Sequence, residues 1–199
     1  SNFGKTIQVS TFGASHGYAI GGIVEGLPCG HTIDINELQA FLKRRAPGQN
    51  QLQTQRKEAD IPEFLSGMVD GMLSGSPLAF MIRNTSQHSG DYNNLRDIPR
   101  PSHADFTARM RYGDKVDMRG GGHFSARLTA PLCVAGGIAI QLLREKGIEI
   151  HGHLKQVGTI QDAPIDMVHP DMKALANIAT EPIAMINPEK RSEVENLVM

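Results

Sequence analysis

The stretch RGGGHFSARLTAPLCVAGGIA, residues 119–139, decides how the fold of this chain is interpreted. Three consecutive glycines, Gly120–Gly122, precede His123, Ser125 and Arg127, and an apolar run of small residues follows. Glycines ahead of a helix leave free N–H groups at the positive end of the helix dipole, and an arginine fork suits phosphate or carboxylate. The pattern therefore predicts an anion site before a helix. A glycine-rich turn ahead of a packed helix is an equally good structural interpretation.

Two further segments each place a histidine in a loop or at a helix start. TFGASHG, residues 11–17, puts His16 between two expected strands, where a loop histidine is well placed for proton transfer. RPSHADFT, residues 100–107, predicts that Ser102 caps a helix. His103 would then lie in the first turn, where the helix dipole lowers imidazole basicity. Taken singly, either histidine could equally be structural.

Five segments of the chain, in order, resemble the chorismate synthase family. They are SHGYAIGGIVEGLP at residues 15–28, KRRAPGQ at 43–49 with TQRKEAD at 54–60, NTSQHSGDY at 84–92, RPSHAD at 100–105 and GGGHFSARLT at 120–129. Single motifs recur by chance, whereas a set in family order does not. The sequence departs from the family pattern at Ala14, His123-Phe124, Leu128 and Gln51.

The resemblance covers the chain from Phe3 to Ile150. Known members are substantially longer, and the resemblance implies further flavin contacts that no motif after Ile150 supplies. We therefore expect residues 1–199 to be one incomplete domain of the family, with Ser1-Asn2 a cloning remnant. Such a domain is expected to fold without being a competent enzyme, because a flavin site that lacks part of its wall is poorly preorganised.

The chemistry that the resemblance implies is a 1,4-anti elimination of phosphate from 5-enolpyruvylshikimate 3-phosphate. The product is chorismate, reduced FMN is required, and NADPH is the implied reductant in bifunctional relatives. The implied catalytic residues are His16, at the departing phosphate, and His103, near the flavin. The other implied contacts are His123, Phe124 and Ser125 to the flavin and Arg45, Arg44 and Arg127 to substrate anions, and no metal is implied.

Basic residues gather in one region of the chain. Lys43, Arg44, Arg45, Arg56 and Lys57 are interrupted by no acidic residue, and the polar segment among them is typical of a mobile loop. Arg45 is expected to lie in this loop. Because surface ion pairs stabilise by only ~0–1 kcal/mol, it is expected to serve substrate binding and not fold stability. A solvated basic face is the alternative structural interpretation.

The hydrophobic patterns predict an α+β fold with short connections. Strands are expected at residues 6–12, 19–27, 64–72, 77–83 and 149–160, and helices at 34–43 (capped by Asp34), 104–112, 130–146 and 171–180. Gly136-Gly137 is expected to allow close helix packing. The resemblance implies a layered β-α-β sandwich of antiparallel sheets enclosing helices, incomplete in this chain and assembled as a homotetramer.

Composition argues against several classes of protein. The 199 residues carry a formal net charge of −1, which is unlike a nucleic-acid binder. No apolar run is seen to approach the ~20 residues that span a bilayer, so no membrane partner and a cytoplasmic location are expected. Cys29 and Cys133 are too few and too far apart for a disulfide framework, and both are expected as free thiols.

Two other functions fit the same residues. A flavin- or nucleotide-binding module without lyase activity would bind flavin but would not turn over the substrate. A structural or interaction domain, whose histidines serve only in loops and caps, would respond to no ligand.

Overall fold

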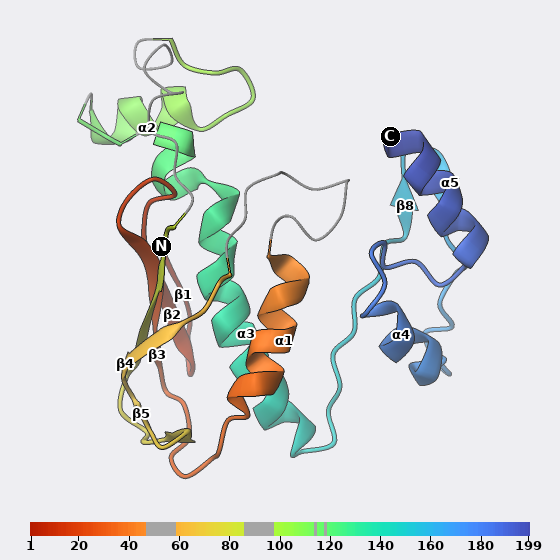
Figure 1. The fold of residues 1–199 in the computed structure, drawn as a ribbon, viewed down its shortest axis with the longest axis horizontal. Helices are drawn as coiled ribbons and strands as arrows, with labels where there is room; N and C mark the ends of the chain where they lie inside the picture. Colours follow the sequence, from red (N-terminus) through yellow and green to blue (C-terminus); the bar gives the residue numbers. More distant parts are fainter. Residues whose placement is uncertain (47–58, 86–97, 114, 118) are drawn as a thin grey trace.

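The sheet that carries the candidate site forms from the first half of the chain. The computed structural model describes residues 1–46, 59–85 and 98–199, apart from 114 and 118. Within these residues, five antiparallel strands pair in the order β1-β2-β3-β7-β4 (Figure 1). Their bounds are β1 Asn2–Gly4, β2 Gln8–Gly13, β3 Ala19–Glu25, β4 Glu63–Ser66 and β7 Leu78–Arg83. Two-residue strands pair as β5 Met68–Val69 with β6 Met72–Leu73, and as β8 Gln156–Val157 with β9 Ile160–Gln161.

Buried side chains at every second position of the strands show which face of the sheet is covered. Leu78, Phe80 and Ile82 occupy every second position of β7 and are fully or almost fully buried. Ile20 of β3 stands opposite Ile82 in the strand register and is also buried. Because side chains alternate between the two faces, these residues share one face, and the core lies against it.

Five α-helices and two short 3₁₀ elements accompany the strands in the described residues. Their bounds are α1 Ile35–Arg45, α2 Asp105–Tyr112, α3 Thr129–Arg144, α4 Met172–Ile178 and α5 Pro188–Val198, with short 3₁₀ elements η2 Arg119–Phe124 and η3 Ala126–Leu128. Asp34 caps α1 as predicted, since its Oδ1 accepts the N–H of Glu37 at 2.9 Å. The four strands or helices expected at 6–12, 19–27, 77–83 and 130–146 are confirmed with small shifts at their ends.

Helices α1 and α3 lie side by side over the covered face of the sheet (Figure 1). Leu38 of α1 and Val134 of α3 belong to the same buried cluster as the sheet residues. A methyl group on Gly137 would lie 2.5 Å from Cδ1 of Leu38. The close packing expected from Gly136-Gly137 therefore occurs at Gly137. The result is an α+β fold with one sheet and one helix layer among the described residues.

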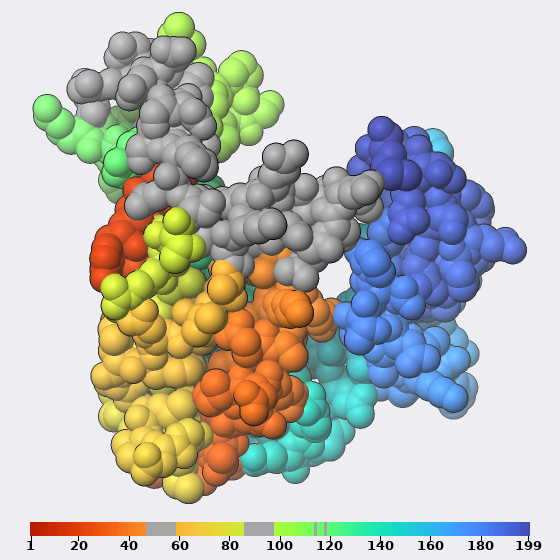
Figure 2. Space-filling view, in the orientation of Figure 1, coloured from red at the N-terminus to blue at the C-terminus, as the bar shows by residue number. Residues whose placement is uncertain are grey.

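Residues after Ile150 form a small lobe on the far side of α1 from the sheet, drawn in blue (Figures 1 and 2). Its own buried cluster contains Ile183, Met185 and Val194. Asp171 caps α4, which confirms the short helix expected at 171–180. Helix α5 was not expected, although Asn187 at its N-cap and the proline that follows are signals for a helix start.

Two expected strands are corrected by the structure. The strand at 64–72 divides into β4 and β5, because the register shifts after Phe64 and Gly67 adopts a φ of 82°. The strand at 149–160 is wrong over most of its length, since only Gln156–Val157 and Ile160 take part in pairing. Leu154 instead donates its N–H to the carbonyl of Ala184 in the C-terminal lobe, so tertiary contact replaces strand pairing there.

One segment has the length and apolar composition of a membrane span, which the composition analysis did not expect. It is Ala126–Arg144, which contains η3 and the core helix α3. Of its most apolar window, 44% is already buried inside the protein. A core helix meets the same criterion as a spanning helix, so this feature is weak grounds for a membrane location.

Candidate functional site

The triple-glycine segment, Gly120–Gly122, is a tight turn in left-handed backbone. The three φ angles are 58°, 97° and 53°, a region that glycine enters without steric cost. The 3₁₀ turn η3 follows before α3 begins at Thr129. The glycines therefore precede the long helix, as expected, but η3 separates them from its first turn.

His16 packs against the first glycine of this turn. A methyl group on Gly120 would lie 2.0 Å from Cε1 of His16, so the imidazole occupies the space that a side chain would need. Nδ1 of His16 lies 3.0 Å from the hydroxyl of Ser15, which donates to the carbonyl of Arg119 at 3.2 Å. The N–H of Ser15 donates to the carbonyl of Gly122 at 3.1 Å. The loop that carries His16, residues 14–17 (the histidine loop), and the glycine turn thus hold each other in place.

His103 packs against the second glycine of the same turn. A methyl group on Gly121 would lie 2.9 Å from Cε1 of His103. The capping prediction is wrong, since α2 begins at Asp105 without a side-chain cap and Ser102 has a φ of 59°. The carboxylate of Asp105 turns back instead and accepts the N–H of Arg100 at 3.0 Å. Adjacent glycines therefore contact both histidines that the resemblance marks as catalytic.

Asp105 sets the charge around His103. Arg100 donates to both carboxylate oxygens, from Nε at 2.8 Å and from Nη2 at 2.9 Å, and Nδ1 of His103 lies 2.9 Å from Oδ1. The hydrogen bonds from Arg100, with a smaller contribution from His103, hold the pKa of Asp105 well below its usual range. Because the folded pKa is lowered, these contacts stabilise the fold above the unfolded carboxyl pKa and lose that contribution as pH falls.

A second carboxylate lies on the His16 side of the turn. Arg119 donates to Asp117 from Nε at 2.9 Å and from Nη2 at 2.8 Å. These bonds lower the pKa of Asp117, and the charge of His16 adds a smaller effect in the same direction. Each histidine of the pair therefore has an ionised carboxylate in its surroundings.

The three expected flavin contacts differ in how far their side chains are engaged within the protein. Nδ1 of His123 donates to the carbonyl of Gly13 at 3.1 Å. The hydroxyl of Ser125 caps η3. Phe124 is 41% exposed, so of the three it presents the most open apolar surface.

Arg45 and Arg127 share one buried carboxylate, that of Asp60. Nη1 of Arg45 bonds to Oδ2, and Nη1 of Arg127 bonds to Oδ1. Nε of Arg127 donates to Asn84 at 3.1 Å, and Nε of Arg45 donates to Thr129 at 3.2 Å. The expectation that Arg45 lies in a loop is wrong, because it occupies the last turn of α1. Arg127 and Asp60 are buried, and Arg45, whose side chain is 22% exposed, covers them from the end of α1.

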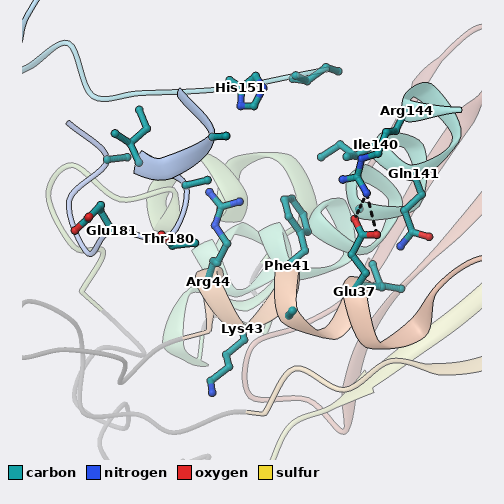
Figure 3. Close-up of a pocket in the computed structure, with 18 of the residues that line it drawn as sticks. Glu37, Phe41, Lys43, Arg44, Ile140, Gln141, Arg144, His151, Thr180 and Glu181 are labelled. Atoms are coloured by element: carbon teal, nitrogen blue, oxygen red, sulfur yellow. Dashed lines mark hydrogen bonds and ion pairs between the residues drawn. The ribbon is translucent and has the colours of Figure 1, made fainter. Parts of the chain in front are cut away.

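Arg44 lies apart from the glycine turn. Its guanidinium sits 5.6 Å from the ring centroid of Phe41, and it lines a groove of about 890 Å³ between the α1–α3 pair and the C-terminal lobe (Figure 3). Glu181 stands on the opposite side of this groove. The two neighbouring arginines of α1 therefore face different regions. Arg56, Lys57 and Gln51 lie outside the described residues.

Sequence reasoning missed two residues of this site, Asp60 and Asn84. Both are buried polar side chains. Each ends a quoted family segment or begins one, and Asn84 directly follows β7, which is the available signal for a functional position. Over the described residues, no group of three His, Cys, Asp or Glu side chains is arranged to hold a metal ion. Cys29 and Cys133 are free thiols, and burial raises the pKa of Cys133.

The sequence profile of one family, chorismate synthase, matches residues 7–199. The chain belongs to the chorismate synthase family. Curated chorismate synthases are similar to it: that of Lancefieldella parvula is 47% identical over 169 residues, which is 84% of this chain and 44% of the relative. The chorismate synthase of Ralstonia pickettii is 49% identical over 161 residues, or 80% of this chain and 44% of the relative. The chain spans about half the length of the curated relatives it matches.

A crystal structure of chorismate synthase has the same fold. It aligns with a TM-score of 0.69 over 98% of this chain and 52% of that chain, at 23% sequence identity. At this identity the likeness shows the fold alone, and it confirms the α+β chorismate synthase-like architecture expected from the sequence.

Proposed function

We propose that this chain supplies part of a chorismate synthase active site, which eliminates phosphate from 5-enolpyruvylshikimate 3-phosphate in the presence of reduced FMN. Family membership supports the reaction. The observation that carries the proposal is the contact of His16 and His103 with adjacent glycines of one turn. A reaction that needs one proton partner for phosphate and one for a flavin requires such a pair close together.

The residues around the turn fit a flavin. Gly120 and Gly121 offer backbone without side chains, where added Cβ atoms would collide with His16 and His103. Phe124 contributes an exposed ring, and the side chain of His103 is 32% exposed. A planar ring system with polar edges can lie against such a surface. Bound reduced FMN would supply the electron density that helps an allylic phosphate to leave.

Each residue has a stated role in the proposal. His16 would give a proton or a hydrogen bond to the departing phosphate, with its ring orientation set by Ser15. His103, beside Asp105, would sit at the flavin edge with His123, Phe124 and Ser125. Arg45 would attract substrate anions, and Arg127 would assist from its buried position. Arg44 faces the groove beside the C-terminal lobe and would not contact an anion at the glycine turn. The complete enzyme would be a cytoplasmic homotetramer, as the resemblance implies.

The test is chorismate formation with chemically reduced FMN under anaerobic conditions. We expect no normal turnover by residues 1–199 alone. We also consider a joined protein, in which this chain replaces the matching part of the Lancefieldella parvula relative. We expect turnover by this joined protein, because it regains the rest of the site. Flavin binding without turnover by the joined protein would favour a binding module. Neither binding nor turnover would contradict the proposal.

A further inference from the structure

We infer that Asn84 is a positioning residue for His16, an inference that rests on the proposed role of that histidine. Asn84 follows β7 directly and is 8% exposed. Its Nδ2 donates to the carbonyl of Ala14 at 3.0 Å and to the carbonyl of Gly17 at 2.8 Å. These carbonyls flank Ser15 and His16, so one side-chain amide closes the loop around the histidine.

The loop is short, and its two ends meet at this amide. The N–H of Gly17 donates to the carbonyl of Ala14 at 3.0 Å, which forms a tight turn. The backbone N–H of Asn84 donates to the carbonyl of Tyr18 at 3.2 Å, so Asn84 also anchors the chain beyond the turn through its main chain. On the opposite side, Gly120 limits movement of the imidazole of His16. The histidine is thus held between the glycine turn and Asn84.

The orientation of the Asn84 amide is decided by its partners. Nε of Arg127 can only donate, and it lies 3.1 Å from Oδ1 of Asn84. The two loop carbonyls can only accept, so they require the NH₂ group. Arg127 is held in turn by the buried carboxylate of Asp60. A chain of hydrogen bonds therefore runs from the ion pair through Asn84 to the histidine loop.

The substitution Asn84→Asp distinguishes a positioning role of this side chain from the effect of merely filling a buried position. Asn84→Asp keeps an oxygen for Arg127 but has no donor for the carbonyls of Ala14 and Gly17. Gln141→Ala is the matched control, because Gln141 also bridges two backbone groups, the N–H and carbonyl of Asp34, at 2.8 and 3.0 Å. That bridge lies at the start of α1 and does not contact the histidine loop.

Two measurements test the inference on Asn84→Asp. In residues 1–199, hydrogen exchange of the Gly17 N–H should accelerate more than that of Ile20 in β3, because local opening becomes easier. In the joined protein, kcat should fall by about 10²-fold with little change in KM, the effect of a misplaced catalytic group. If Asn84→Asp does not fold, the same two measurements are made on Asn84→Ser, which keeps one donor and adds no buried charge.

Exchange and kcat equal to wild type in Asn84→Asp would overturn the inference. So would an equal loss of kcat in Gln141→Ala, since the effect would then be general destabilisation. Failure of the proposed function is distinguishable: the unsubstituted joined protein would then make no chorismate, while Gly17 exchange would still report on Asn84.

Discussion

His16→Ala is expected to lower the turnover of the joined protein by about 10²–10⁴-fold at saturating substrate, the usual contribution of general acid–base help. The imidazole lies against Gly120 and is oriented by Ser15, so its removal leaves the departing phosphate without its proposed proton partner. Turnover is measured as chorismate formed with chemically reduced FMN. The effect should fall on kcat, because the interaction is made mainly as the phosphate leaves.

The matched control for this prediction is His31→Ala. His31 also contacts a neighbouring side chain, with Nδ1 at 2.7 Å from Glu145, but it lies away from the glycine turn. Its loss should leave kcat close to that of the wild type. Unchanged turnover in His16→Ala at saturating substrate would remove His16 from the proposed mechanism.

Asp60→Asn is expected to lower the free energy of unfolding by about 3–5 kcal/mol, the cost of removing one partner from a buried ion pair. The Asp60 side chain is fully buried, and the side chain of Arg127 is only 4% exposed. Without the carboxylate, two arginines lose the charge that compensates them inside the protein. Chemical denaturation of residues 1–199 measures the loss directly.

Glu63→Gln is the control for Asp60→Asn. Glu63 also pairs with an arginine, Arg83, but both side chains are close to half exposed, so solvent screens the pair. Its denaturation midpoint should stay near that of the wild type. If Asp60→Asn is no more destabilised than Glu63→Gln, the buried charge network does not support the fold.

The elements with strong local signals were predictable from sequence. Asp34 before an apolar helical pattern gave the start of α1, and the alternation of Leu78, Phe80 and Ile82 gave β7. Ser102 looked like a helix cap because its residue type suits one. In the structure Ser102 has a left-handed φ, and Asp105 bonds back to Arg100, a contact that residue preferences do not contain.

The candidate site was predictable as a set of residues but not as an arrangement. Three consecutive glycines before His123, Ser125 and Arg127 marked this stretch as special. Which of the glycines meets His16 and which meets His103 depends on the tertiary fold. Arg45 was assigned to the polar loop that follows it because the helix was expected to end at Lys43, whereas α1 extends to Arg45, which pairs with Asp60. Asn84 carried no local signal beyond its place at a strand end, since its role arises from carbonyls of a distant loop.

The central claim is that one glycine turn places His16 and His103 at a single ligand site. A titration of residues 1–199 with reduced FMN, followed through the imidazole NMR signals, tests it most directly. Both histidines should shift along the same binding curve, even where affinity is weak, while His31 should not move. A shift of His103 without His16, or of neither up to the solubility of the flavin, would contradict the claim.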